Sequence, residues 1–181
     1  LPARVVADPE LTLGLPRHLT TWTGIDALSH CLEAYCAPGF HPMADGIALE
    51  GMRLIHGSLQ RVVRDGQDIE ARSWMMAASM MGATAFQKGL GGMHALAHPI
   101  GAYHDCHHGR TIGVVMPYVL SWNMEVVAPR LARLAAVLGL PSSTAEAFVQ
   151  WVLDLRTEVG IPRTLQELGV PSGNLDVLSA A

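Results

Sequence analysis

Histidine is concentrated in one short stretch of the sequence. Five of the nine histidines lie between His94 and His108, and packing alone does not explain such clustering. His94 and His98 are four residues apart, so both imidazoles project from one face if this segment is helical. His108 follows beyond Pro99 and Gly101, where the chain can turn back. These histidines are therefore the first candidates for a binding or catalytic site.

A second pair of polar residues lies upstream. Asp26 and His30 are also four residues apart and share a helical face. If the two pairs face each other in a bundle, a carboxylate and several imidazoles meet, which suits Fe(II), Zn(II) or Mn(II) and is poor for Cu(I). Either pair alone could be a surface contact or a satisfied core contact. Together they predict a metal centre, although the spacing does not decide between His94 and His98 as a ligand. The small residues that let ligands and backbone approach are Gly91, Gly92, Ala95, Ala97, Gly101 and Gly109.

Two other metal-dependent chemistries fit less well. The run from His94 to His98 has the spacing of a zinc-peptidase helix, but that chemistry needs a Glu after the first His, where the sequence has Ala95. A phosphohydrolase of the HD type needs adjacent His and Asp ligands, and the pair His104-Asp105 is expected in a loop. A metal-dependent hydrolase is the weaker alternative. The remaining histidines are interpreted as bystanders of the cluster (His104, His107) or as solvated side chains (His18, His41, His56).

The elements that would hold these residues are helical. Apolar residues recur at steps of three and four from Ala48 to Val62, which predicts an amphipathic helix. From Ile69 to Phe86 the pattern is apolar nearly all round, as in a central buried helix, and its methionines are interpreted as core filling. Shorter apolar stripes over 131–138 and 148–155 predict two more helices.

Local signals set the expected boundaries. The helix with Asp26 is expected over 23–35, opened by Thr23-Gly24 and closed by Pro38-Gly39, and the helix with His94 is expected to begin after the glycine pair 91–92. Ser143 and Glu146 can form a capping box for the last helix, which Gly160 and Pro162 end. The only strand candidates are residues 4–7 and 113–116. The sequence therefore predicts an all-α helical bundle.

Composition excludes several classes of protein. The 181 residues are 50% hydrophobic and 15% charged, which is against disorder. The acidic and basic residues are scattered along the chain and leave a net charge of −4, so nucleic acid is not an expected partner. The longest uncharged stretches, 73–87 and 111–124, are too short to cross a membrane. The start at Leu1 lacks the basic and apolar regions of a signal peptide, and three cysteines without a CxxC pair indicate a reducing, cytoplasmic compartment. The shortage of charge favours a surface covered by another domain or subunit, and a homodimer is expected.

Two segments carry a family resemblance. Residues 23–35 (TGIDALSHCLEAY) resemble the first metal-binding helix of the iron-containing (group III) alcohol dehydrogenases. Residues 92–101 (GMHALAHPIG), followed by His108-Gly109, resemble the second signature of that family. Residues 8–16, 116–118 and 160–165 are similar to it as well, so the resemblance covers essentially the whole chain.

The resemblance implies a helical C-terminal domain of the dehydroquinate synthase-like fold that holds a metal. The family's ligands fall here on Asp26, His30, His94 and His108. His98 matches the histidine beside the nicotinamide and the substrate, so it is the expected catalytic and cofactor-binding residue. Related glycerol dehydrogenases and dehydroquinate synthases use fewer protein ligands, and maleylacetate reductases are thought to work without metal. The full set of one Asp and three His favours the alcohol dehydrogenase branch.

The chain departs from the family in one respect. Family members begin with a nucleotide-binding α/β domain carrying a glycine-rich phosphate turn, and residues 1–181 are expected to form a single helical metal-binding domain without it. Gly89 to Gly92 precedes the metal helix and is interpreted as a hinge. The expected activity of the intact enzyme is reversible hydride transfer between a primary or short-chain alcohol and NAD or NADP, with Fe(II) or Zn(II) polarising the substrate oxygen. The piece alone is expected to be inactive. The alternatives are a non-catalytic metal-binding or oligomerisation module and a reductase similar to maleylacetate reductase.

Overall fold

The structure, a computed structural model, describes residues 3–171. Within this range the chain forms helices and no strand, which confirms the all-α prediction. The α-helices are α1 (Arg17–Cys36), α2 (Pro42–Arg64), α3 (Ile69–Ala85), α4 (Gly92–His104), α5 (His108–Trp122), α6 (Met124–Val137) and α7 (Ala145–Glu158). Short 3-10 helices lie at η1 (Pro9–Thr12), η2 (Phe86–Lys88) and η3 (Gln166–Leu168).

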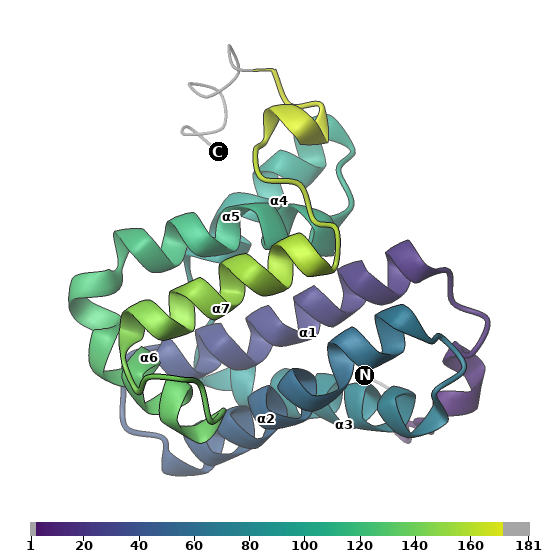
Figure 1. Cartoon of the computed structure of the whole chain (residues 1–181), viewed down its shortest axis with the longest axis horizontal. Helices are drawn as coiled ribbons and strands as arrows, with labels where there is room; N and C mark the ends of the chain where they lie inside the picture. The colour runs from purple at the N-terminus through teal and green to yellow at the C-terminus, as the bar shows by residue number, and fades with distance from the viewer. Residues whose placement is uncertain (1–2, 172–181) are drawn as a thin grey trace.

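Helix α1 is the central element of the bundle. Figure 1 shows it crossing the middle of the fold, and it packs against α2, α3 and α5. Leu28, Cys31 and Leu32 on α1 are completely buried. A glycine permits the closest approach to α3, because a Cβ at Gly82 would lie 2.9 Å from the Cβ of His30. The residues that α1 carries are therefore fixed by the core itself.

Three expected elements differ from the structure. The candidate strand 113–116 lies inside α5, because a short buried apolar run cannot be told from a buried helical segment by periodicity. The candidate strand 4–7 is exposed and irregular. Helix α3 is not buried all round: Ala71, Ala78 and Ala85 face the core, whereas Met80 is 47% exposed. The prediction of a central buried helix over 69–86 was wrong, since it is α1 that takes this place.

Two expected helix starts were also wrong. Helix α1 begins at Arg17 rather than at Thr23, and the Thr23 hydroxyl donates to the Leu19 carbonyl one turn back, as it does inside a helix. Helix α7 is capped by Thr144, whose hydroxyl oxygen accepts from the Ala147 N–H at 3.2 Å, so Ser143 is not the capping residue.

A polar cluster holds the C-terminal end of α1. The Lys88 ammonium, whose side chain is 3% exposed, lies 2.6 Å from the Asp45 carboxylate, and it also donates to the Tyr35 carbonyl. Arg130 donates to the same carbonyl at 2.6 Å and lies 3.2 Å from Asp45. Two cations at the carbonyl end of a helix complement its dipole. The cluster joins α1 to α2, η2 and α6.

No single helix among the described residues has the length and apolarity to cross a bilayer. Helices α5 and α6 reach that length and apolarity only when they are taken together, and they are bent by 111° at the break between them.

Candidate metal centre

Three helices bring the candidate ligands together. Asp26 and His30 lie one turn apart on α1, His94 lies near the start of α4, and His108 is the first residue of α5. Between α4 and α5 the chain reverses at Asp105, which has a left-handed backbone with φ of 51°. This reversal, which the sequence predicted near Gly101, returns His108 to the face of α4 that carries His94.

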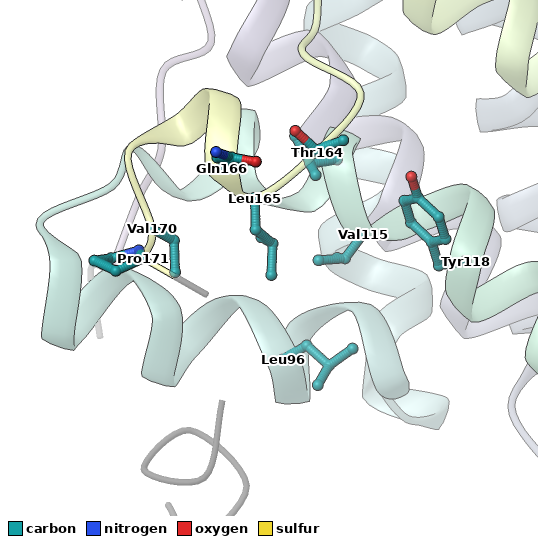
Figure 2. A pocket seen from close by; sticks show the side chains of 9 residues that line it. Leu96, Val115, Tyr118, Thr164, Leu165, Gln166, Val170 and Pro171 are labelled. Carbon is teal, nitrogen blue, oxygen red and sulfur yellow. The ribbon is translucent and has the colours of Figure 1, made fainter. Parts of the chain in front are cut away.

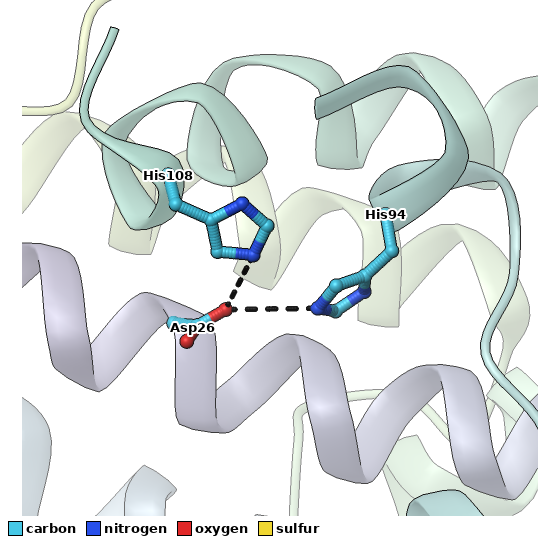
Figure 3. Close-up of side chains that lie close together, drawn as sticks. All are labelled: Asp26, His94 and His108. Atoms are coloured by element: carbon cyan, nitrogen blue, oxygen red, sulfur yellow. Dashed lines mark ion pairs between the residues drawn. The ribbon is translucent and has the colours of Figure 1, made fainter. Parts of the chain in front are cut away.

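Asp26 lies at the centre of the group. Its Oδ1 atom is 3.3 Å from His108 Nε2 and 3.7 Å from His94 Nε2. Figure 3 shows both imidazoles directed at this oxygen. One ligand atom each from Asp26, His94 and His108 lies within 4.8 Å of the others. His30 lies beside this group: its Nε2 is 3.7 Å from Asp26 Oδ1, and its ring stacks on His94 with 5.0 Å between centroids.

Two atoms of this group are buried without a hydrogen-bond partner among residues 3–171. They are Asp26 Oδ1 and His94 Nε2. A buried acceptor left unsatisfied costs about 1–3 kcal/mol, so native structures rarely keep one without a reason. A divalent cation between the two atoms would satisfy both. One carboxylate oxygen and imidazole nitrogens form a donor set that iron and zinc accept, so the residues present fit such a metal.

Burial favours the neutral form of two of the imidazoles, those of His30 and His108. Burial lowers the pKa of His30 below its ordinary value, with His94 acting in the same direction and Asp26 opposing it. Burial also lowers the pKa of His108, to which the neighbouring imidazoles contribute. Since a protonated imidazole cannot bind a metal, both side chains are in the form that a cation requires.

Glu33 was missed as a site residue by the sequence reasoning. Its side chain is 4% exposed, and Oε2 lies 2.6 Å from His94 Nδ1. Its other oxygen accepts the Met93 backbone N–H at 2.6 Å. Burial alone would raise the pKa of Glu33, but these hydrogen bonds lower it below the ordinary value, so the carboxylate is ionised. One signal was present: Glu33 is an acidic residue in an apolar helix, seven residues after Asp26 and therefore on the same face.

His98 lies next to the group but is exposed. Its ring stacks on His108 with 5.3 Å between centroids and meets His94 edge-on at 5.8 Å. The imidazole is therefore beside the candidate metal position and open to a bound molecule.

The other histidines take various places. His107 packs against Trp22, and His18 meets the same ring edge-on. His41 is exposed and caps α2 by accepting the Ala44 N–H. His56 is half-buried against Trp151, and burial lowers its pKa, so the expectation that it is solvated was wrong.

Two cavities lie near α4 and α5. The first, of about 390 Å³, is almost wholly apolar, as Figure 2 shows, and the Tyr118 hydroxyl at its edge is already bonded to the Arg163 carbonyl. Its lining side chains come from Leu96, Val114, Val115, Tyr118, Thr164, Leu165, Gln166, Val170 and Pro171. The second, of about 410 Å³, lies behind the site and is lined in part by Glu33, Gly91 and Arg130. Neither holds the candidate ligands Asp26, His94 and His108.

Comparison with known proteins decides the family. A family model described as Fe-containing alcohol dehydrogenase family, C-terminal, matches residues 20–181. The chain belongs to this family. It is 47% identical over 189 residues to 4-hydroxybutyrate dehydrogenase of Cupriavidus necator, covering 99% of the chain and 49% of that relative. It is 38% identical to alcohol dehydrogenase 4 of Saccharomyces cerevisiae, covering 98% of the chain and 47% of that relative.

Solved structures of the iron-type alcohol dehydrogenase family share the fold. The crystal structure of 1,3-propanediol oxidoreductase superposes with a TM-score of 0.92 at 33% identity, over 96% of this chain and 47% of that one. Maleylacetate reductase from Rhizobium sp. superposes with a TM-score of 0.84 at 32% identity, over 95% of this chain and 48% of that one. The chain thus spans about half the length of the relatives it matches.

Proposed function

We propose that residues 1–181 form a single metal-binding domain of an NAD(P)-dependent dehydrogenase that interconverts an alcohol and an aldehyde or ketone. The observation that carries this proposal is the group of Asp26, His94 and His108, in which Asp26 Oδ1 and His94 Nε2 are buried and have no partner in the described part of the chain. His30 would complete the ligand set from its place beside Asp26. The family to which the chain belongs supports a metal, Fe(II) or Zn(II), and a nicotinamide cofactor bound by a separate nucleotide-binding domain.

In this proposal each residue has a chemical task. A bound divalent cation would supply Lewis-acid chemistry to the substrate oxygen. The Asp26 carboxylate would offset positive charge, and His94 and His108 direct their Nε2 atoms toward it. His98, exposed and stacked on His108, would orient the nicotinamide or hold a proton at its imidazole.

The substrate class follows from the relatives. Their names include a 4-hydroxybutyrate dehydrogenase and a 1,3-propanediol oxidoreductase, and both of these substrates are short molecules with a terminal hydroxyl. We propose a substrate of this class, either a primary alcohol or a hydroxy acid. A maleylacetate reductase is among the solved structures that share the fold, so a metal-free reductase is the second candidate function. The complete set of one Asp and three His disfavours this second candidate.

Metal analysis tests the proposal directly. The chain is purified without oxygen, and its iron and zinc are counted for the wild type, His94→Ala and His98→Ala. We expect about one metal per wild-type chain, none with His94→Ala, and full occupancy with His98→Ala, because His98 lies outside the ligand group. A wild type without metal would contradict the metal centre, and equal loss in both variants would contradict the division of roles.

A further inference from the structure

One contact behind the candidate metal centre has the geometry to fix the orientation of a candidate metal ligand, His94. Glu33 lies two turns after Asp26 on α1, and its carboxylate reaches across to the start of α4. Oε1 accepts the Met93 N–H, and Oε2 lies 2.6 Å from His94 Nδ1. With 4% exposure, the Glu33 side chain has almost no contact with solvent, so its polar partners are groups of the protein itself.

The surroundings of Glu33 favour a side chain whose two terminal atoms both accept hydrogen bonds. A backbone N–H can only donate, so Oε1 must accept. The carboxylate also lies at the N-terminus of α4, where unpaired N–H groups stabilise negative charge. A carboxylate here accepts from His94 as well, which places the imidazole proton on Nδ1. The lone pair of His94 is then on Nε2, the atom that faces Asp26 Oδ1.

The backbone makes room for this carboxylate. Gly91 is the residue before α4, and a Cβ at that position would lie 2.9 Å from Glu33 Oε1. That distance is shorter than real Cβ contacts allow, so with any other residue either the carboxylate or the backbone at the start of α4 must shift. Gly91 is therefore part of the arrangement that orients the His94 imidazole.

We propose that Glu33 is a positioning residue, which holds His94 in the Nδ1-protonated form with Nε2 directed at the metal position and thereby raises metal affinity. The affinity part of the inference rests on the proposed metal centre, whereas the tautomer part does not. Partners of this kind orient a ligating imidazole and increase its basicity, and their loss commonly lowers metal affinity by about 10–100-fold.

Glu33→Gln is the informative variant because it keeps the shape and removes one acceptor. The Gln side chain has one accepting oxygen and one donating NH2 group. If the oxygen faces Met93, the NH2 group faces His94 Nδ1 and favours the tautomer with its proton on Nε2. If the side chain is turned over, the NH2 group opposes the Met93 N–H instead. Glu50→Gln is the matched control, because Glu50 is a half-exposed carboxylate that pairs with Arg53 on α2.

Two measurements separate this inference from the proposed function. The first is the tautomer of His94 in metal-free protein, read from long-range ¹H–¹⁵N correlations of the imidazole. The second is Co(II) affinity, measured by competition with a chromophoric chelator and by the visible absorption of bound Co(II). Thermal unfolding of each metal-free variant identifies any that fail to fold, and Glu33→Ala serves as a second variant.

We expect the wild type and Glu50→Gln to show the Nδ1-protonated tautomer and equal Co(II) affinity. In Glu33→Gln and Glu33→Ala the tautomer preference is lost, and Co(II) affinity falls by about 10–100-fold with a changed absorption spectrum. A wild type protonated at Nε2, or a folded Glu33→Gln with unchanged tautomer and affinity, would overturn the inference. A wild type with the expected tautomer that takes up no Co(II) would support the positioning of His94 and overturn the metal centre instead.

Discussion

The unpartnered Asp26 oxygen lowers the stability of the metal-free protein. A substitution that gives this position a hydrogen bond should therefore stabilise the metal-free fold. Among the described residues, Asp26 Oδ1 is buried and accepts no hydrogen bond, and it faces His94 Nε2, which also has no partner there. The Asp26→Asn variant has the same shape, but its amide NH2 group can donate to the nearest imidazole nitrogen, His108 Nε2, which lies 3.3 Å from the Asp26 oxygen. We expect metal-free Asp26→Asn to be more stable than the wild type by about 1 kcal/mol, the usual net value of one such hydrogen bond. For a chain of this size the unfolding temperature then rises by about 2–4 °C.

Zinc should reverse this order. At a free concentration of one hundred times Kd, a ligand that binds only the folded state stabilises it by about 2.7 kcal/mol. The unfolding temperature of the wild type should therefore rise by about 5–10 °C on adding zinc, and that of Asp26→Asn by much less. The assay is calorimetry at pH 8, where the imidazoles are neutral, first with EDTA and then with zinc.

The control is Asp154→Asn, because Asp154 is an exposed carboxylate on α7 that bonds only Gln150 among the described residues. Its unfolding should differ from the wild type by no more than about 0.5 kcal/mol in both solutions. The reasoning is refuted if Asp26→Asn unfolds below the wild type in EDTA, or if zinc stabilises the two proteins equally.

Two further predictions concern the fold. Hydrogen bonds from Lys88 and Arg130 lower the pKa of Asp45 against the opposing effect of burial, so its contribution to stability is present above pH 3.8 and lost as the pH falls through the lower folded-state pKa. Asp45→Asn should cost about 1–3 kcal/mol at pH 7, since it leaves the buried Lys88 without its carboxylate, and urea unfolding should show this difference shrinking below pH 3.8. Thr144→Ala should cost about 1 kcal/mol and Ser143→Ala almost nothing; equal costs in urea unfolding would mean that Thr144 is not the cap of α7.

The helical class and the grouping of the site residues could be predicted because both depend on local spacing. The pairs Asp26/His30 and His94/His98 need only the pitch of a helix to share a face. The start of α1 could not be read in this way, because Thr20, Thr21 and Thr23 disfavour a helix locally and the burial of Thr20 and Thr21 overrides that preference.

Glu33 shows where sequence reasoning ends. A carboxylate in an apolar helix indicates that some partner must exist, but nothing in the spacing says which. Its partner, His94, is sixty-one residues away and belongs to another helix. The contact therefore appears only once the packing of α1 and the start of α4 are known.

The attachment of α4 has a consequence for motion in the molecule. Helix α4 packs chiefly against α5, and its polar links to the central helix α1 are the contacts of Glu33 and of the Asp26 group. The same few side chains thus arrange the site and restrain residues 92–104 against the rest of the bundle. A change at any of them alters the freedom of a whole helix as well as the chemistry at its face, so loss of the site and loosening of α4 should accompany each other.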